Sequence, residues 1–227
     1  MSYVLNIANK NHSSWSLRAW VLMRALGIPF EERLTAFVEG GSAATFRAFS
    51  PSGKVPVLID GERVVWDSLA ITEYLAERHA TVWPVDIDAR AWARSAAAEM
   101  HSGFDALRTE CSLSCAVRMR LHAITPGLQR DLDRLCELWG EGLVRFGGPF
   151  LAGSAFTAVD AFFAPVAFRI QTFDLPLDPA ALAYAEHLRG IPAMREWYEA
   201  AVVEPLRDPD HDEELAHYAE LVEDLRV

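Results

Sequence analysis

Short apolar runs alternate with polar loops and helical repeats through the first 80 residues of the chain. The run Tyr3–Ile7 is typical of a buried strand, and the helical repeat that follows it ends at Gly27 and Pro29. Asp60 and Gly61 form a dipeptide typical of a tight hairpin. The pattern predicts the order β-α-β-α-β-β-α, over residues 3–7, 17–26, 31–36, 42–49, 55–59, 62–66 and 69–79.

The character of the chain changes near residue 80. The segment 81–88 contains Trp83 and Pro84 and is a plausible linker, and no clear strand pattern follows Val65. Helices are expected over residues 89–120, 128–146, 157–173 and 194–203. We therefore expect a mixed α/β domain over residues 1–80, a linker over 81–88 and an all-helical domain over 89–227.

Composition places the protein among globular chains, since 51% of its residues are hydrophobic and 23% are charged. The net charge of −11 disfavours nucleic acid and anionic membranes as partners, because both attract basic patches, and it is most simply explained by solubility. No apolar run approaches the roughly 20 residues of a membrane span, and the first ten residues lack a signal-peptide layout. We expect a cytoplasmic location.

The three cysteines fit a reducing compartment. Cys111 and Cys115 are four residues apart, which suits one face of a helix, but two thiols without a nearby pair of histidines make a poor zinc site. We expect no metal, and we interpret these cysteines as core or surface residues.

Four short motifs follow one another along the chain, at Asn11–Arg18, Gly53–Leu58, Asp67–Ile71 and Phe150–Asp160. In this order and spacing they resemble the cytosolic glutathione transferase family across nearly the whole chain. The serine-rich first motif is most similar to the zeta class and related bacterial members. The resemblance implies a thioredoxin-like glutathione-binding domain followed by an all-α domain, with glutathione as co-substrate.

The first motif places two serines just before the first predicted helix. A helix N-terminus favours anions, and a hydroxyl there could donate a hydrogen bond to a thiolate. Ser14 or Ser16 could instead be an ordinary N-cap. The resemblance implies a catalytic role for Ser13, whose spacing to Arg18 matches the zeta motif, and Ser14 remains the alternative.

The second and third motifs carry the residues that the resemblance assigns to glutathione. It implies that Pro56 is cis, so that the backbone of Val55 pairs with the cysteinyl part of glutathione. Ser68 and its backbone would hold the γ-glutamyl carboxylate, while Asp67 faces the amino group, although Ser68 could also simply cap the third helix. Lys54 would reach the glycyl carboxylate or remain in solvent.

The fourth motif has a structural interpretation. Thr157 and Asp160 form a capping-box pattern before an apolar helix. The resemblance also assigns this element to folding of the helical domain and not to chemistry.

The second substrate is expected between the domains, against the early loop and the long helix after the linker. Residues 100, 104, 108 and 111 share one helix face, although an apolar stripe at this spacing is more often plain core. Trp15 stands where the zeta class often carries a cysteine, which puts maleylacetoacetate isomerase activity in doubt, and the absence of cysteine before residue 111 argues against thiol-reductase branches. The candidate substrate-binding residues are Trp15, His101, Phe104 and Arg108, with Met100 and Cys111 as further wall residues.

The leading hypothesis is a transferase that adds the glutathione thiolate to a small electrophile, a reaction typical of detoxification. The alternatives are a glutathione-dependent cis-trans isomerase and a non-catalytic ligand-binding or regulatory relative. The resemblance implies a homodimer, for which Phe46, Phe49 and Trp66 would suit the interface. The acidic tail over residues 208–224 is expected to form a solvated helix without a partner.

Overall fold

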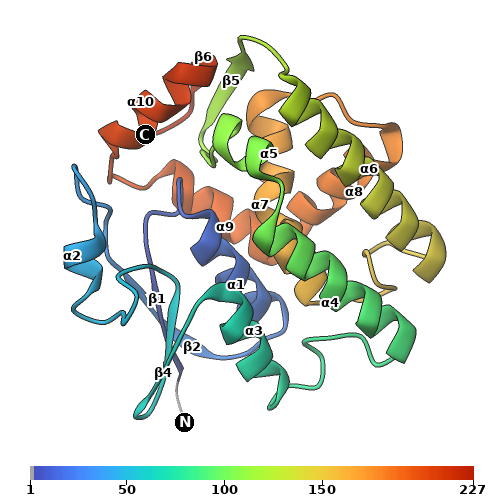
Figure 1. The fold of residues 1–227 in the computed structure, drawn as a ribbon. Helices are drawn as coiled ribbons and strands as arrows, with labels where there is room; N and C mark the ends of the chain where they lie inside the picture. The colour runs from blue at the N-terminus through green and yellow to red at the C-terminus, as the bar shows by residue number, and fades with distance from the viewer. Residues whose placement is uncertain (1–2) are drawn as a thin grey trace.

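The computed structural model describes residues 3–227, and the first part of the chain forms a four-stranded sheet with helices (Figure 1). The strands lie in the order β2-β1-β3-β4, with β1 and β2 parallel and the other neighbours antiparallel. The predicted order β-α-β-α-β-β-α is confirmed for this region. Its elements are β1 (Tyr3–Ile7), α1 (Ser14–Ala25), β2 (Phe30–Leu34), α2 (Ala43–Phe46), β3 (Val57–Asp60), β4 (Arg63–Trp66) and α3 (Ser68–Ala76).

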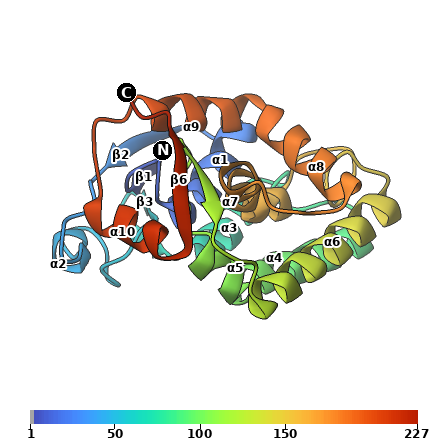
Figure 2. The same cartoon turned by 90° about the horizontal axis from the view of Figure 1, so that it is seen from above.

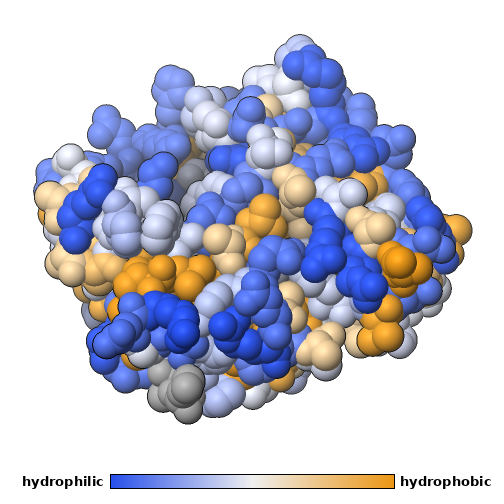
Figure 3. Space-filling model, turned by 60° about the horizontal axis from the view of Figure 1, so that its bottom comes forward, coloured by the Kyte–Doolittle hydropathy of each residue, from blue (hydrophilic) through white to orange (hydrophobic). Residues whose placement is uncertain are grey.

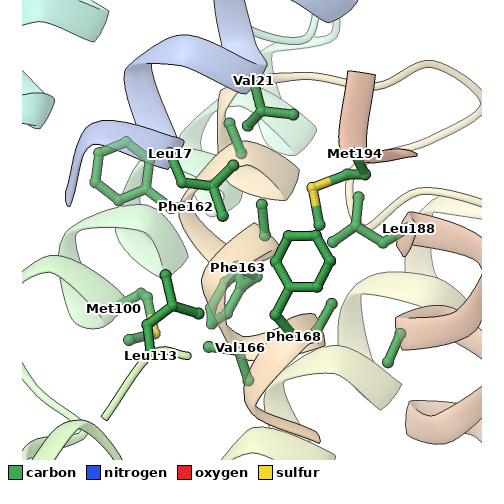
Figure 4. Packing of buried hydrophobic residues seen from close by; sticks show 14 of the residues in the cluster. Leu17, Val21, Met100, Leu113, Phe162, Phe163, Val166, Phe168, Leu188 and Met194 are labelled. Carbon is green, nitrogen blue, oxygen red and sulfur yellow. The ribbon is translucent and has the colours of Figure 1, made fainter. Parts of the chain in front are cut away.

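The rest of the chain is mainly helical and surrounds one apolar helix. Nearly every residue of α7 is buried, because α1, α4 and α8 pack around it (Figure 2). In the packing beside α7, Leu17 of α1 lies near Phe162, and both belong to one buried cluster that joins the two parts of the chain (Figure 4). The helices are α4 (Ile87–Ser102), α5 (Asp105–Glu110), α6 (Pro126–Phe146), α7 (Ala158–Phe173), α8 (Pro179–Gly190), α9 (Pro192–Val202) and α10 (Pro209–Tyr218).

The prediction of one helix over residues 89–120 is wrong. Helix α4 ends at Ser102, and Phe104 has a left-handed backbone with φ of 57° before α5 begins. Gly103 between them has an extended backbone, and glycine is a poor helix former. The chain therefore changes direction between α4 and α5. Residues 100, 104, 108 and 111 thus do not share one face of a single helix, as was expected.

A two-stranded antiparallel sheet also lies in the second part of the chain, so the prediction of no strand after Val65 is wrong. It is formed by β5 (Val117–Leu121) and β6 (Ala219–Asp224). Apolar residues alternate with arginines along β5, and Val117 and Met119 are buried while Arg120 is exposed. The tail is therefore the helix α10 followed by a strand, and not one helix over 208–224.

The capping-box prediction at the start of α7 is confirmed. The carboxylate of Asp160 is fully buried and accepts hydrogen bonds from the N–H of Leu151 at 3.0 Å, the N–H of Thr157 at 2.9 Å and the hydroxyl of Tyr184 at 2.8 Å. Burial raises the pKa of Asp160 to about 6, against the lowering effect of these donors. Asp160 thus joins α7, α8 and the preceding loop.

Apolar surface is exposed along β4 and α3, and Figure 3 shows apolar atoms gathered on this lower face of the molecule. Trp66 is 46% exposed there, with Val64 beside it at 39%. Phe46, in contrast, is buried against Phe37 and Phe49, which removes it from the expected interface residues.

Candidate functional site

A cavity of about 830 Å³ opens between the start of α1, the loop into β3, the start of α3 and helix α10. Its walls bring together most of the residues singled out in the sequence: Ser13, Ser14, Trp15, Lys54, Val55, Pro56, Asp67, Ser68 and Arg108. His101 and Phe104 are not among the wall residues. The ring of His101 contacts Trp15, with 5.3 Å between ring centroids, and Phe104 is buried against Phe163.

Ser13 stands at the N-cap position of α1, but its side chain makes no cap hydrogen bond. Its Oγ instead donates to Ser16 Oγ over 2.7 Å, and Ser16 Oγ also accepts from the N–H of Ala8 at 3.3 Å. Ser16 is therefore not the N-cap. Ser14 is half-buried and also lines the cavity, so both candidate serines face the same space.

The loop before β3 holds the next part of the wall. The peptide between Val55 and Pro56 is cis, as the resemblance implied. Ser50 braces this loop, because its Oγ donates to the Lys54 carbonyl at 2.6 Å and accepts from the Lys54 N–H at 3.2 Å. Gly53 has φ of +69°, and a side chain there would lie 3.1 Å from a carbonyl of α2, so this position requires glycine.

The start of α3 offers a free hydroxyl to the cavity. Asp67 is the cap of this helix, since its Oδ1 accepts from the N–H groups of Leu69 at 2.8 Å and Ala70 at 3.3 Å. The alternative that Ser68 is the cap is thus wrong. The Oγ of Ser68 is buried, faces the cavity wall and has no hydrogen-bond partner within residues 3–227. An orphaned hydroxyl beside helix N–H groups fits a ligand carboxylate.

Helix α10 closes the other end of the cavity, which the sequence analysis did not predict. The rings of His211 and His12 lie 4.2 Å apart between centroids, and His211 Nε2 lies 2.9 Å from the carbonyl oxygen of Leu113. The Gly40 N–H donates to Asp210 Oδ2 at 2.8 Å. These contacts hold α10 against His12, Leu113 and Gly40, which are distant from it in the sequence. No local pattern in the tail indicates them.

The buried histidine of this contact predicts acid sensitivity. Burial, followed by the nearby charges of His211, Arg226 and Arg207, lowers the pKa of His12 to about 3. The unfolded chain titrates near 6.5, so the stabilisation from a neutral His12 is complete above that pH and is lost as the pH falls below it. Between pH 7 and pH 5 this loss is about 2 kcal/mol.

Urea unfolding at the two pH values checks this prediction. The variant His12→Gln should lose less stability than the wild type on acidification, whatever its stability at pH 7. Equal losses in both proteins would contradict the role of His12.

Comparison with known proteins agrees with this geometry. A probable maleylacetoacetate isomerase of Vibrio cholerae is 27% identical over 192 residues, which cover 80% of this chain and 89% of the relative. A zeta-class glutathione S-transferase of Euphorbia esula is 27% identical over 157 residues, covering 67% and 70%. The family described as "Glutathione S-transferase, N-terminal domain" matches residues 12–78.

Residues 12–78 thus match a glutathione S-transferase N-terminal domain, and the chain is similar to zeta-class members over most of its length. A glutathione transferase homologue from Burkholderia, solved with bound glutathione, superposes with a TM-score of 0.68 at 23% identity, covering 88% of this chain and 98% of its own. The predicted fold class, a thioredoxin-like domain followed by a helical domain, is thereby confirmed. The small sheet of β5 and β6 departs from the all-helical second domain that was expected.

Two further findings concern metal ions and membranes. Within the part of the chain that the structure describes, no group of three or more His, Cys, Asp or Glu side chains could hold a metal ion. In the same residues, no helix is both long and apolar enough to cross a membrane.

Two arginines lie beside Trp15 at the cavity wall. The guanidinium of Arg108, a wall residue, lies 5.0 Å from the Trp15 ring centroid, and that of Arg18, which lies behind the wall, is 4.2 Å from it. Arg18 is 2% exposed, and its Nε and Nη1 have no hydrogen-bond partner among residues 3–227. Burial and the like charges of Arg169 and Arg108 lower the pKa of Arg18. The two guanidiniums make the wall beside Trp15 positive, whereas Asp67, Asp208, Asp210 and Glu214 also line the cavity.

Proposed function

We propose that this protein binds glutathione in the cavity, holds its thiol as the thiolate and adds it to a small electrophile. The observation that carries the proposal is the convergence of Ser13, the Val55–Pro56 segment and Ser68 on one cavity. Ser68 Oγ has no partner in the described chain, and Ser13 Oγ makes no cap bond and donates to Ser16 Oγ, a bond that it would exchange for one to the thiolate.

Each part of glutathione has candidate partners in this arrangement. Ser68 and the N–H groups at the start of α3 would bind the γ-glutamyl carboxylate, and Asp67 would face the amino group through the carboxylate oxygen that does not cap the helix. The backbone of Val55 would pair with the cysteinyl part, which places the thiol near Ser13. Lys54 is exposed at the wall and would bind the glycyl carboxylate.

Thiolate formation needs a moderate amount of energy. A free thiol titrates near pH 8.5, and each unit by which its pKa is lowered needs about 1.4 kcal/mol of preferential stabilisation of the anion. A hydrogen bond to a charged group contributes about 1.5–3 kcal/mol and a helix N-terminus about 0.3–1 kcal/mol. Ser13 and the start of α1 can therefore lower the thiol pKa by about two units.

A titration of glutathione into the wild-type protein tests the proposal. Calorimetry should show binding, and the thiolate absorbance of the complex should titrate well below the pH at which free glutathione does. Binding with an unchanged thiol pKa would favour the non-catalytic, ligand-binding alternative. No binding at millimolar glutathione would refute both.

A glutathione-dependent cis-trans isomerase is the second candidate, because the positive wall beside Trp15 favours an anionic substrate. Maleylacetoacetate, the compound in the names of two relatives, is a dicarboxylate. In such a reaction the thiolate adds to a double bond and leaves again, so the same thiolate site serves both candidates. Trp15, whose ring contacts the guanidiniums of Arg18 and Arg108, gives this wall a bulk that the zeta-class cysteine lacks.

Arg108→Met is expected to separate charged from uncharged electrophiles. The value of kcat/KM for a carboxylate-bearing electrophile should fall about 10- to 100-fold, because a charge-assisted hydrogen bond is lost, while that for an uncharged aryl halide should change by less than about threefold. The control is Arg120→Met, at an exposed position of β5. An equal loss for both electrophiles would assign Arg108 to folding or to glutathione binding.

We also propose a homodimer that buries the exposed surface around Trp66 and Val64, since such a surface is unusual on a monomer. The domain boundaries at residues 80 and 88 and the cytoplasmic location remain predictions. The first predicted domain begins at residue 1, which lies outside the described residues. The three cysteines are free, which agrees with a reducing compartment.

A further inference from the structure

Ser16 is a fully buried serine whose hydroxyl touches that of Ser13, and nothing in the proposed reaction yet uses it. We propose that Ser16 is a positioning residue, which donates its own hydroxyl proton to Ser13 Oγ when Ser13 donates to the glutathione thiolate. This inference rests on the proposed function, because it concerns the donor that stabilises the thiolate.

The hydrogen bond between Ser13 and Ser16 must change when glutathione binds, because each hydroxyl has only one proton to donate. A serine hydroxyl has one proton to donate and two lone pairs. In this structure Ser13 Oγ donates that proton to Ser16 Oγ over 2.7 Å. The same proton cannot also stabilise a thiolate, so Ser13 must turn its O–H toward the thiol. The Ser13–Ser16 hydrogen bond then either breaks or reverses its direction.

The surroundings of Ser16 favour reversal. Its Oγ accepts from the N–H of Ala8, and both residues are 0% exposed, so bulk water does not compete for the hydroxyl. Among the described residues, the hydrogen bonds of Ser16 Oγ are those with the Ala8 N–H and Ser13 Oγ, and in both of them Ser16 accepts. Reversal therefore gives the Ser16 proton a partner, and the bond to Ala8 is retained.

Reversal also makes Ser13 a better donor. In a chain of hydrogen bonds each bond polarises the next, by about 10–30% per bond, and this effect is largest where water is excluded. Ser13 and Ser16 are three residues apart and lie on the same side of the first turn of α1, with Ser16 held by the end of β1. No such contact supports Ser14 in the described chain, which gives Ser13 an advantage as the thiolate donor.

A double-mutant cycle on the full chain tests the inference. The pKa of the bound glutathione thiol is measured by thiolate absorbance for wild type, Ser13→Ala, Ser16→Ala and the double variant. Ser16→Ala should raise this pKa by about half a unit, a threefold change in the acid constant, when Ser13 is present. It should leave the pKa unchanged in the Ser13→Ala background. Ser95→Ala, at an exposed serine of α4 whose hydroxyl donates to Ala91, is the control.

Each outcome decides the matter. If Ser16→Ala shifts the thiol pKa equally in both backgrounds, or in neither, the positioning role of Ser16 is overturned. The proposed function stands in that case if the wild-type thiol pKa is low. A wild type that binds no glutathione refutes both the proposed function and the positioning role of Ser16. If Ser16→Ala does not fold because the Ala8 N–H loses its acceptor, Ser16→Cys retains a weak donor and acceptor in a slightly larger side chain and should show a smaller shift in the same direction.

Discussion

Alanine at position 13 is expected to raise the pKa of the bound glutathione thiol by about two units, close to its free value. The reason is that Ser13 supplies the charge-assisted hydrogen bond, and helix α1 alone supplies the smaller part of the stabilisation. At pH 7 kcat/KM should fall about 25-fold, because a rise of the thiol pKa from about 6.5 to about 8.5 lowers the thiolate fraction from about three quarters to about 3%. Glutathione affinity should change little, since the binding groups at the start of α3 are retained.

Ser14→Ala is the matched comparison for this experiment. Ser14 lines the same cavity and is half-buried, but Ser13 has the hydrogen bond to Ser16. The Ser14 variant should therefore shift the thiol pKa by less than about half a unit. A two-unit shift in this variant, with none for Ser13→Ala, would show that the neighbouring serine is the donor.

The variant Asp160→Ala should lose about 3–5 kcal/mol of unfolding free energy, although the residue lies outside the cavity. Its carboxylate is the acceptor for the N–H groups of Leu151 and Thr157 and the hydroxyl of Tyr184, all in a region without solvent. Removing it leaves these three buried donors, and the Thr157 hydroxyl that lies 3.4 Å from the carboxylate, without this acceptor. Denaturant unfolding monitored by circular dichroism measures the loss.

Tyr184→Phe is the control for Asp160, because it removes one of the three donors and leaves the acceptor in place. It should cost about 1 kcal/mol. If Asp160→Ala costs no more than this control, the carboxylate does not hold the start of α7. Burial raises the pKa of Asp160 to about 6 from an unfolded value near 4, so its contribution to stability is greatest below about pH 4 and falls as the pH rises through 6. Asp160→Asn should remove this dependence.

Local patterns predicted the first part of the chain well, because its elements are short, have clear periodicity and are separated by Gly, Pro and Asp residues. They failed after residue 100. There, Gly103 and the left-handed Phe104 interrupt a repeat that otherwise reads as one helix. They also missed β5, since five residues of alternation are weak evidence until a partner strand from the far end of the chain pairs with them.

The sequence by itself determined which groups are available for chemistry: a serine-rich loop before a helix, Val55 before a proline, and Asp67 with Ser68 at a helix start. These are local signals, and their meaning depends on a few neighbouring residues. Only the tertiary structure decided that Asp67 and not Ser68 caps α3, that Ser13 bonds to Ser16, and that α10 closes the cavity. Such contacts depend on backbone direction and on residues distant in the chain, about which local periodicity carries no information.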